Sequence, residues 1–220
     1  MRTLPETILL HAHSLPEGGV ISPKQFLHLG SRAAVDQALS RLTKQGRLLR
    51  AGSGMYVTPV SGRFGTRPPA PEKVVAALAA QHGEAMAAHG ASAANALGLT
   101  RQVPIREVYL TSGRTRTLTL GRSEVLVKHA PRWMLALGSR PAGAAVRALA
   151  WMGQPHAAES LAALHRTLPP SEWQALASAR AALPSWMARA IGVEAGVEAG
   201  LEAGIEPGAG AGVSMEPVRA

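Results

Sequence analysis

The stretch that decides the fold runs SRAAVDQALSRLTKQG over residues 31–46 and RLLRAGSGMYVT over residues 47–58. In its first part, apolar side chains recur at i, i+3, i+4 and i+7, which gathers them on one side of a helix: Val35, Ala38, Leu39 and Leu42. Ser31 is a typical N-cap, and Gly46 suits the left-handed residue that follows a last helical turn. Two glycines between short apolar runs in the second part are typical of a tight hairpin. The stretch therefore predicts an amphipathic helix followed by a hairpin.

The residues before this stretch complete a larger pattern. Two short helical segments precede it, and the second ends at a turn that contains Gly30. A helix, a short turn, a second helix and a hairpin together form a winged helix-turn-helix. We therefore expect such a domain over residues 1–58, with helices or strands at residues 4–15, 20–21, 23–28, 31–45, 47–51 and 55–58.

The remainder of the chain predicts an α+β protein. Residues 59–71 are rich in Pro, Gly, Ser and Arg and are expected to form a basic linker. Residues 72–191 are expected to form a mixed α+β domain, with a small antiparallel sheet and a helical C-terminal part. Residues 192–220 contain a four-residue repeat with a glycine in each unit, and we expect this tail to be disordered.

The charge is positive and unevenly distributed. The net charge of +9 divides into +6 over residues 1–70, +7 over residues 71–191 and −4 over residues 192–220. Such a surface attracts polyanions, of which nucleic acid is the commonest, whereas no long apolar run favours a membrane. The chain has no cysteine, and its first residues lack the apolar core of a signal peptide. We expect a cytoplasmic protein with double-stranded DNA as its partner.

The outward side of the helix over residues 31–45 supplies the candidate DNA contacts. It carries Ala33, Gln37, Ser40 and Lys44. In a major groove, Gln37 is suited to adenine and Ala33 to a thymine methyl group, while basic and hydroxyl side chains hold phosphates. The full set of expected DNA-binding residues is Ser31, Arg32, Ala33, Gln37, Ser40, Arg41, Lys44, Arg47, Arg50, Ser53, Arg63 and Arg67.

Catalytic and metal-binding patterns are weak by comparison. His11 and His13 are two residues apart and point in different directions on a helix, so no metal site is expected. The glycines near Arg114 and Arg122 lack the spacing of a phosphate-binding loop. No Gly-x-Ser-x-Gly elbow is present. We expect no cofactor and no enzymatic activity, and we expect the four tryptophans to belong to the core.

Several motifs of this sequence resemble motifs of the AbiEi-type antitoxins of type IV toxin–antitoxin systems, and they occur in the same order along the chain as in that family. These motifs are residues 29–35 (LGSRAAV), 54–56 (GMY), 89–99 (HGASAANALGL), 102–104 (QVP), 109–113 (YLTSG) and 183–187 (LPSWM). The resemblance implies a winged helix that binds inverted repeats in its own promoter and represses its operon. It also implies a second domain that counteracts a nucleotidyltransferase-like toxin without a stable complex, and a possible dimer on DNA. Ser53 stands where the family would place a basic residue, so Arg50 is expected to carry more of the phosphate contact.

Two alternatives remain open. One is a stand-alone winged-helix regulator whose second domain senses a ligand or dimerises. The other is a nucleic-acid-modifying enzyme that uses residues 72–191.

Overall fold

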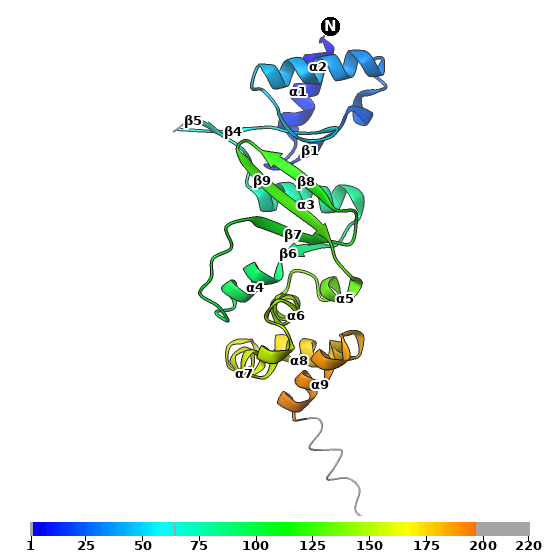
Figure 1. Ribbon diagram of the computed structural model, residues 1–220. Helices are drawn as coiled ribbons and strands as arrows, with labels where there is room; N and C mark the ends of the chain where they lie inside the picture. Colours follow the sequence, from blue (N-terminus) through cyan, green and yellow to red (C-terminus); the bar gives the residue numbers. More distant parts are fainter. Residues whose placement is uncertain (1, 64, 197–220) are drawn as a thin grey trace, which may run out of the picture.

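The N-terminal unit, residues 2–58, is a pair of helices on a three-stranded sheet (Figure 1). The structure is a computed structural model and describes residues 2–63 and 65–196. The sheet is antiparallel, with the strand order β1-β3-β2. The elements of this unit are α1 (Leu4–Ser14), β1 (Val20–Ile21), a 3-10 turn (Pro23–Phe26), α2 (Arg32–Lys44), β2 (Leu49–Gly52) and β3 (Met55–Val57).

Helix α2 has the ends and the buried side that its sequence predicts. The four apolar side chains at helical spacing are at most 5% exposed. The hydroxyl of Ser31 accepts the Ala34 N–H at 3.3 Å, and Gly46 has a left-handed φ of 70°. The expected helix over 23–28 is shorter and is a 3-10 turn. The first wing strand begins at Leu49 rather than at residue 47, because the N–H groups of Arg47 and Leu48 donate to the Leu42 carbonyl and close α2.

The N-terminal unit is not independent of the rest of the chain. One side of its sheet, with Ile21 and Tyr56, packs on α1 and α2. The other side packs against the second part of the protein in a cluster that we call the shared core. Successive residues of a strand face opposite sides, so this short sheet buries both faces. The shared core consists of Val20, Ala51, Val57, Val74, Val75, Leu78, Leu118, Leu120, Val125 and Val127.

The expected linker over residues 59–71 is instead largely structured. Strands β4 (Val60–Gly62) and β5 (Gly65–Arg67) pair in an antiparallel hairpin that projects from the side of the molecule (Figure 1). Its described side chains are half-buried or exposed. Backbone pairing therefore holds the hairpin, and its Pro-, Gly- and Ser-rich composition gave no alternating apolar pattern by which to predict it.

The second part is built on a four-stranded central sheet with the order β6-β7-β9-β8. It is mixed rather than antiparallel as expected, because β7 and β9 run parallel, with Leu110 opposite Lys128. The neighbouring strands β8 and β9 form an antiparallel hairpin, and β7 pairs with the other side of β9. The strands are β6 (Met86–Ala88), β7 (Glu107–Thr111), β8 (Arg116–Leu120) and β9 (Ser123–His129).

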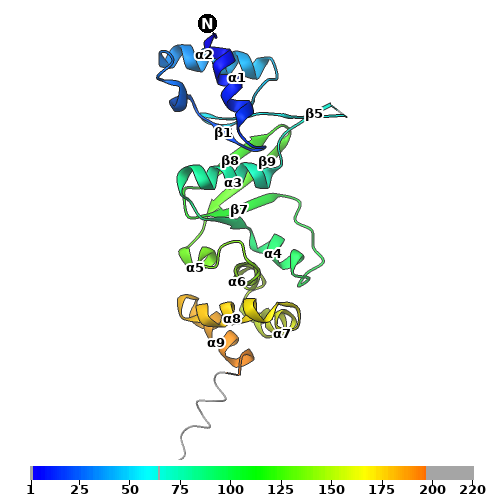
Figure 2. The ribbon, with the colours of Figure 1, turned by 180° about the vertical axis from the view of Figure 1, so that it is seen from behind.

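Helices cover both faces of the central sheet (Figures 1 and 2). Helix α3 (Pro71–His82) lies on the side of the shared core, and α5 (Arg132–Leu135) packs through Leu135 against Leu110 on the other side. Beyond α5, α6 (Pro141–Met152) begins a helical layer that continues to the end of the described chain. The other helices are α4 (Gly90–Ala96), α7 (Ala157–Thr167), α8 (Pro170–Ala179) and α9 (Ser185–Glu194), with 3-10 turns at Gln154–His156 and Arg180–Ala182.

The C-terminal boundary differs from the expected one. Helix α9 continues to Glu194, so the first residues of the expected disordered tail are helical. Ile191 is fully buried, which ties this last turn to the helical core. The tail from residue 197 onward lies outside the described residues.

Candidate nucleic-acid interface

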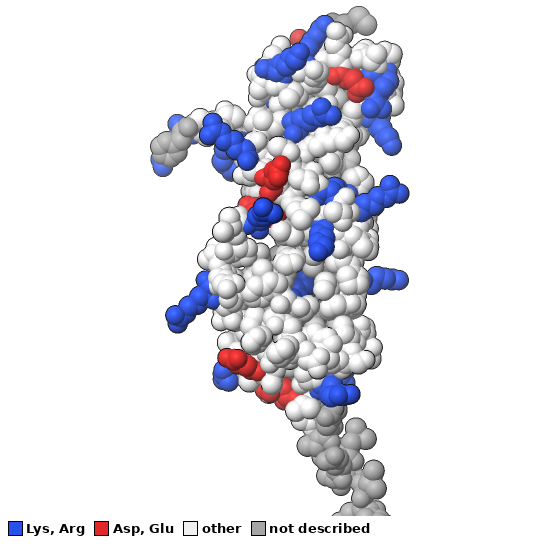
Figure 3. Space-filling model, viewed as in Figure 1, with Lys and Arg blue, Asp and Glu red and all other residues white. Residues whose placement is uncertain are grey.

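The outward side of α2 is the clearest candidate site in the N-terminal unit. Ala33, Gln37, Ser40 and Lys44 are all exposed, and we call this surface the α2 face. The side chains at the centre of this surface are small or polar, so no bulky side chain there prevents close contact with a partner. Figure 3 shows Lys and Arg side chains on the N-terminal helices and on the projecting hairpin. The α2 face combines the amide of Gln37, which can bond a base edge, with the cation of Lys44, which can bond a phosphate.

All twelve expected contact residues are exposed, but several of their polar groups already have partners. Arg32 pairs with Asp36 at 2.8 Å, one helical turn away. The Ser31 hydroxyl accepts the N-cap hydrogen bond. Arg50 Nε donates to the Gly52 carbonyl at 3.3 Å. The charge of Arg32 is thus partly balanced, whereas Arg41 and Lys44 stand in the last turn of α2 with no carboxylate in that turn.

The hairpin β2–β3 brings Arg50 to the same side as α2. Arg50 lies directly opposite Tyr56 in the register, and directly opposed residues in an antiparallel pair share a face. Because Tyr56 belongs to the core beneath α1 and α2, Arg50 lies on the helical side of the sheet. Ser53 occupies the turn at its tip, while Arg47 precedes β2. The opposite side of the hairpin packs against β8 and the shared core, so that side is not available to a partner.

The last two expected residues lie on a separate arm. Arg63 and Arg67 belong to the β4–β5 hairpin, and both are exposed. Arg67 Nη1 lies 3.1 Å from Glu17 Oε1 and 3.0 Å from the Pro68 carbonyl oxygen. The structure therefore puts Arg50 on the helical side of the sheet and gives Arg67 an ion pair within the protein.

Glu17 joins the N-terminal unit to α3. One of its carboxylate oxygens accepts a hydrogen bond from Lys73, and the other accepts the Ala70 N–H at 3.2 Å. These bonds, with a further contribution from Arg67, lower the pKa of Glu17 to about 2. No local pattern predicts this contact, because the partners of Glu17 are fifty or more residues away along the chain.

A second group of cations was missed by sequence reasoning. Arg147 is 2% exposed and lines a cavity between the central sheet and α6, together with Lys128 and His89. Two sequence patterns could have located these residues. Arg147 is the single charge in the otherwise apolar helix α6, and the alternation of β9 puts Lys128 on the face opposite Val125 and Val127. Trp151, expected in the core, is 38% exposed at this cavity.

The described residues show neither a metal cluster nor a membrane-spanning helix. Among the described residues, no three or more His, Cys, Asp or Glu side chains gather in a way that could hold a metal ion. No helix in the described part of the chain has both the length and the apolar character needed to cross a membrane.

Comparison with known proteins places the chain in a family. A model described as "Family of unknown function (DUF6088)" matches residues 7–167. The match begins in α1 and ends with α7, so it spans the α2 face, the shared core and the cavity beside Arg147. The curated proteins and the solved structures give no match. Because the matched region covers most of the chain, this protein belongs to the DUF6088 family.

Proposed function

We propose that the protein is a DNA-binding transcriptional repressor whose N-terminal unit acts as a winged helix-turn-helix. The observation that carries this proposal is the α2 face, whose four residues are all exposed and include Lys44, with Arg41 in the same last turn of α2. Helix α2 would lie in the major groove, with Gln37 toward the base edges. Arg41, Lys44 and Arg50 would bond phosphates on the same side of the unit.

The packing of the wing adds a constraint on this mode of binding. Because the back of β2–β3 is covered by the central sheet, DNA can approach only from the α2 side. A single unit of this size contacts few base pairs, so specific binding requires two copies on an inverted repeat. The second copy would be recruited on the DNA, in the cytoplasm, at the protein's own promoter.

The test separates the two kinds of contact. Gel-shift titrations over a range of salt concentrations would use DNA from upstream of the protein's own gene. We expect Lys44→Ala to weaken binding to all sequences and to reduce the salt slope by about one. We expect Gln37→Ala to cost about 1–3 kcal/mol of discrimination at one base pair and to leave the salt slope unchanged.

Arg189→Ala is the matched control, because Arg189 is an exposed cation on α9, far along the chain from the α2 face. Loss of affinity in this control equal to that of Lys44→Ala would show that only overall charge matters. No effect from Lys44→Ala and Gln37→Ala together would refute the placement of α2 in the groove.

We further propose that the protein is an antitoxin, which rests on the motifs shared with AbiEi-type antitoxins. Residues 72–194, which follow the β4–β5 hairpin, would counteract a nucleotidyltransferase-like toxin without catalysis of their own. The toxin would be encoded beside the gene of this protein. Growth of cells that express both genes tests this. We expect wild type and Lys44→Ala both to restore growth, because neutralisation and DNA binding belong to different parts of the chain. Continued growth arrest with wild-type protein would refute the antitoxin proposal and leave the repressor proposal standing.

A further inference from the structure

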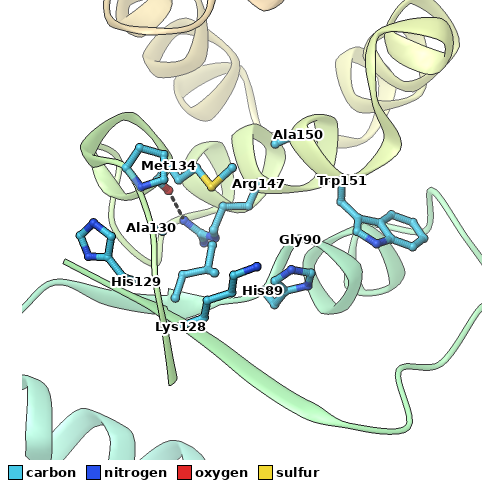
Figure 4. Close-up of a pocket in the computed structure, with 11 residues that line it drawn as sticks. His89, Gly90, Lys128, His129, Ala130, Met134, Arg147, Ala150 and Trp151 are labelled. Carbon is cyan, nitrogen blue, oxygen red and sulfur yellow. Dashed lines mark hydrogen bonds between the residues drawn. The ribbon is translucent and has the colours of Figure 1, made fainter. Parts of the chain in front are cut away.

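A cavity of about 320 Å³ lies on the side of the central sheet that faces away from the N-terminal unit. It is lined by residues of β7, β9, α4, α5 and α6 and of their connections (Figure 4). Part of its wall is apolar, with Leu110, Met134, Ala150 and Trp151. The polar part holds His89, Lys128, His129 and Arg147, and none of the described residues that line the cavity is acidic. Its volume suits a small organic molecule rather than a few waters.

Arg147 is the unusual member of this group. It is 2% exposed, and its Nη1 donates to the carbonyls of Met134 at 3.2 Å and Gly138 at 2.8 Å. Its Nε has no acceptor among the described residues. Burial lowers the pKa of Arg147 to about 10, so the guanidinium is still cationic at neutral pH. A buried cation is normally paired with an anion, and here the described residues supply only two carbonyl oxygens.

Lys128 and His89 add donors to the same space. Lys128 lies opposite Leu110 in the parallel register, and both side chains line the cavity. His89 Nδ1 accepts the Ala91 N–H at 3.2 Å, which assigns the ring proton of the neutral imidazole to Nε2. Burial, together with the charge of Lys128, lowers the pKa of His89. Figure 4 shows the amine of Lys128 directed toward the His89 ring, with Arg147 above them.

These features point to a ligand that brings the missing negative charge. We propose that the cavity binds a small organic oxyanion, with its phosphate or carboxylate group at Arg147 and Lys128 and its body against the apolar wall. Charge-assisted hydrogen bonds to Arg, Lys and an imidazole N–H are the usual means of holding either group. Bare phosphate would leave the apolar wall unused, so a ligand with an apolar or planar body fits better. The proposal is independent of DNA binding, because the α2 face lies beyond the opposite face of the central sheet.

Isothermal titration calorimetry at constant ionic strength and neutral pH tests this on the full chain. The probes are phenyl phosphate, benzoate and inorganic phosphate. We expect saturable binding with one site per chain for phenyl phosphate or benzoate, and weaker binding of inorganic phosphate, which has no apolar body. Tighter binding of phenyl phosphate would identify a phosphate-bearing ligand, and tighter binding of benzoate a carboxylate-bearing one. Either result supports the proposal.

Variants place the binding in this cavity. We expect Arg147→Met and Lys128→Gln each to lower the affinity for the probe by about tenfold or more. Arg122→Gln is the matched control, because it removes one exposed cation from the β8–β9 turn, outside the cavity, and its affinity should equal that of wild type. Arg147 also holds two backbone carbonyls, so if Arg147→Met does not fold, Lys128→Gln and His89→Gln decide.

Three results would overturn the proposal. The first is no saturable binding of phenyl phosphate or benzoate at millimolar concentrations. The second is wild-type affinity in Lys128→Gln, and the third is an equal loss in Arg122→Gln.

Discussion

Replacement of Leu118 by alanine tests whether the N-terminal unit and the central sheet fold as one body. Leu118 lies in β8, is fully buried, and belongs to the shared core with Val20 and Val57 of the N-terminal unit. Truncation of a fully buried leucine costs about 2–5 kcal/mol through lost burial and a residual cavity. We take about 3 kcal/mol, which corresponds to roughly a 150-fold change in the unfolding equilibrium.

Hydrogen exchange followed by mass spectrometry measures which parts of the chain lose stability in this variant. If both parts unfold together, amides in α2 and β3 should exchange roughly 150-fold faster in Leu118→Ala, as should amides in β9. Faster exchange in α2 is informative because α2 packs on one side of the N-terminal sheet, whereas the shared core lies on the other side.

The matched control is Leu126→Ala. Leu126 lies in the adjacent strand β9 but on the other face of the sheet, and it is 37% exposed. We expect a change below about 0.5 kcal/mol there. Unchanged exchange in α2 and β3, together with faster exchange in β9, would refute a single cooperative body and restore the two independent domains that the sequence predicts.

Three further predictions concern local features. Ser31→Ala removes the acceptor of the Ala34 N–H and should lower the free energy of unfolding in urea by about 1 kcal/mol; an unchanged value would mean that the cap contributes nothing. Gly90→Ala would put a Cβ 2.4 Å from the Arg147 carbonyl oxygen, so we expect a destabilisation of about 1–3 kcal/mol in thermal denaturation, and wild-type stability would show that α4 can move away from α6. Because the pKa of Glu17 is lowered from 4.5 to about 2, its contribution is complete above pH 4.5 and is lost as the pH falls toward 2. Urea unfolding at several pH values should show this loss in wild type and a weaker pH dependence of the unfolding free energy in Glu17→Gln. An identical pH dependence in both proteins would exclude the ion pairs of Glu17 as the source of the loss.

The elements with a local periodic pattern were predicted well from the sequence. The buried stripe of α2, the cap at Ser31 and the left-handed Gly46 follow from residues within one or two turns of each other. The hairpin of β8 and β9 follows from two alternating segments joined by a turn at Gly121. The outward residues of α2 were predicted as exposed for the same reason, because the buried side of a helix also defines its free side.

The order of elements in the N-terminal unit, the buried and free sides of α2, and an α+β composition thus follow from the sequence, since each depends on neighbours along the chain. Only the tertiary structure decided what those elements meet. The pairing of β7 with β9, the burial of the back of β3, the contact of Glu17 with Lys73 and the enclosure of Arg147 all join residues distant in sequence. The consecutive apolar residues of β3, Met55–Val57, indicate that both of its faces are apolar, but they do not say which segment covers each face. The physical reason is that sheet pairing and burial are settled by packing of the whole chain, whereas helix faces and caps are settled within a few residues.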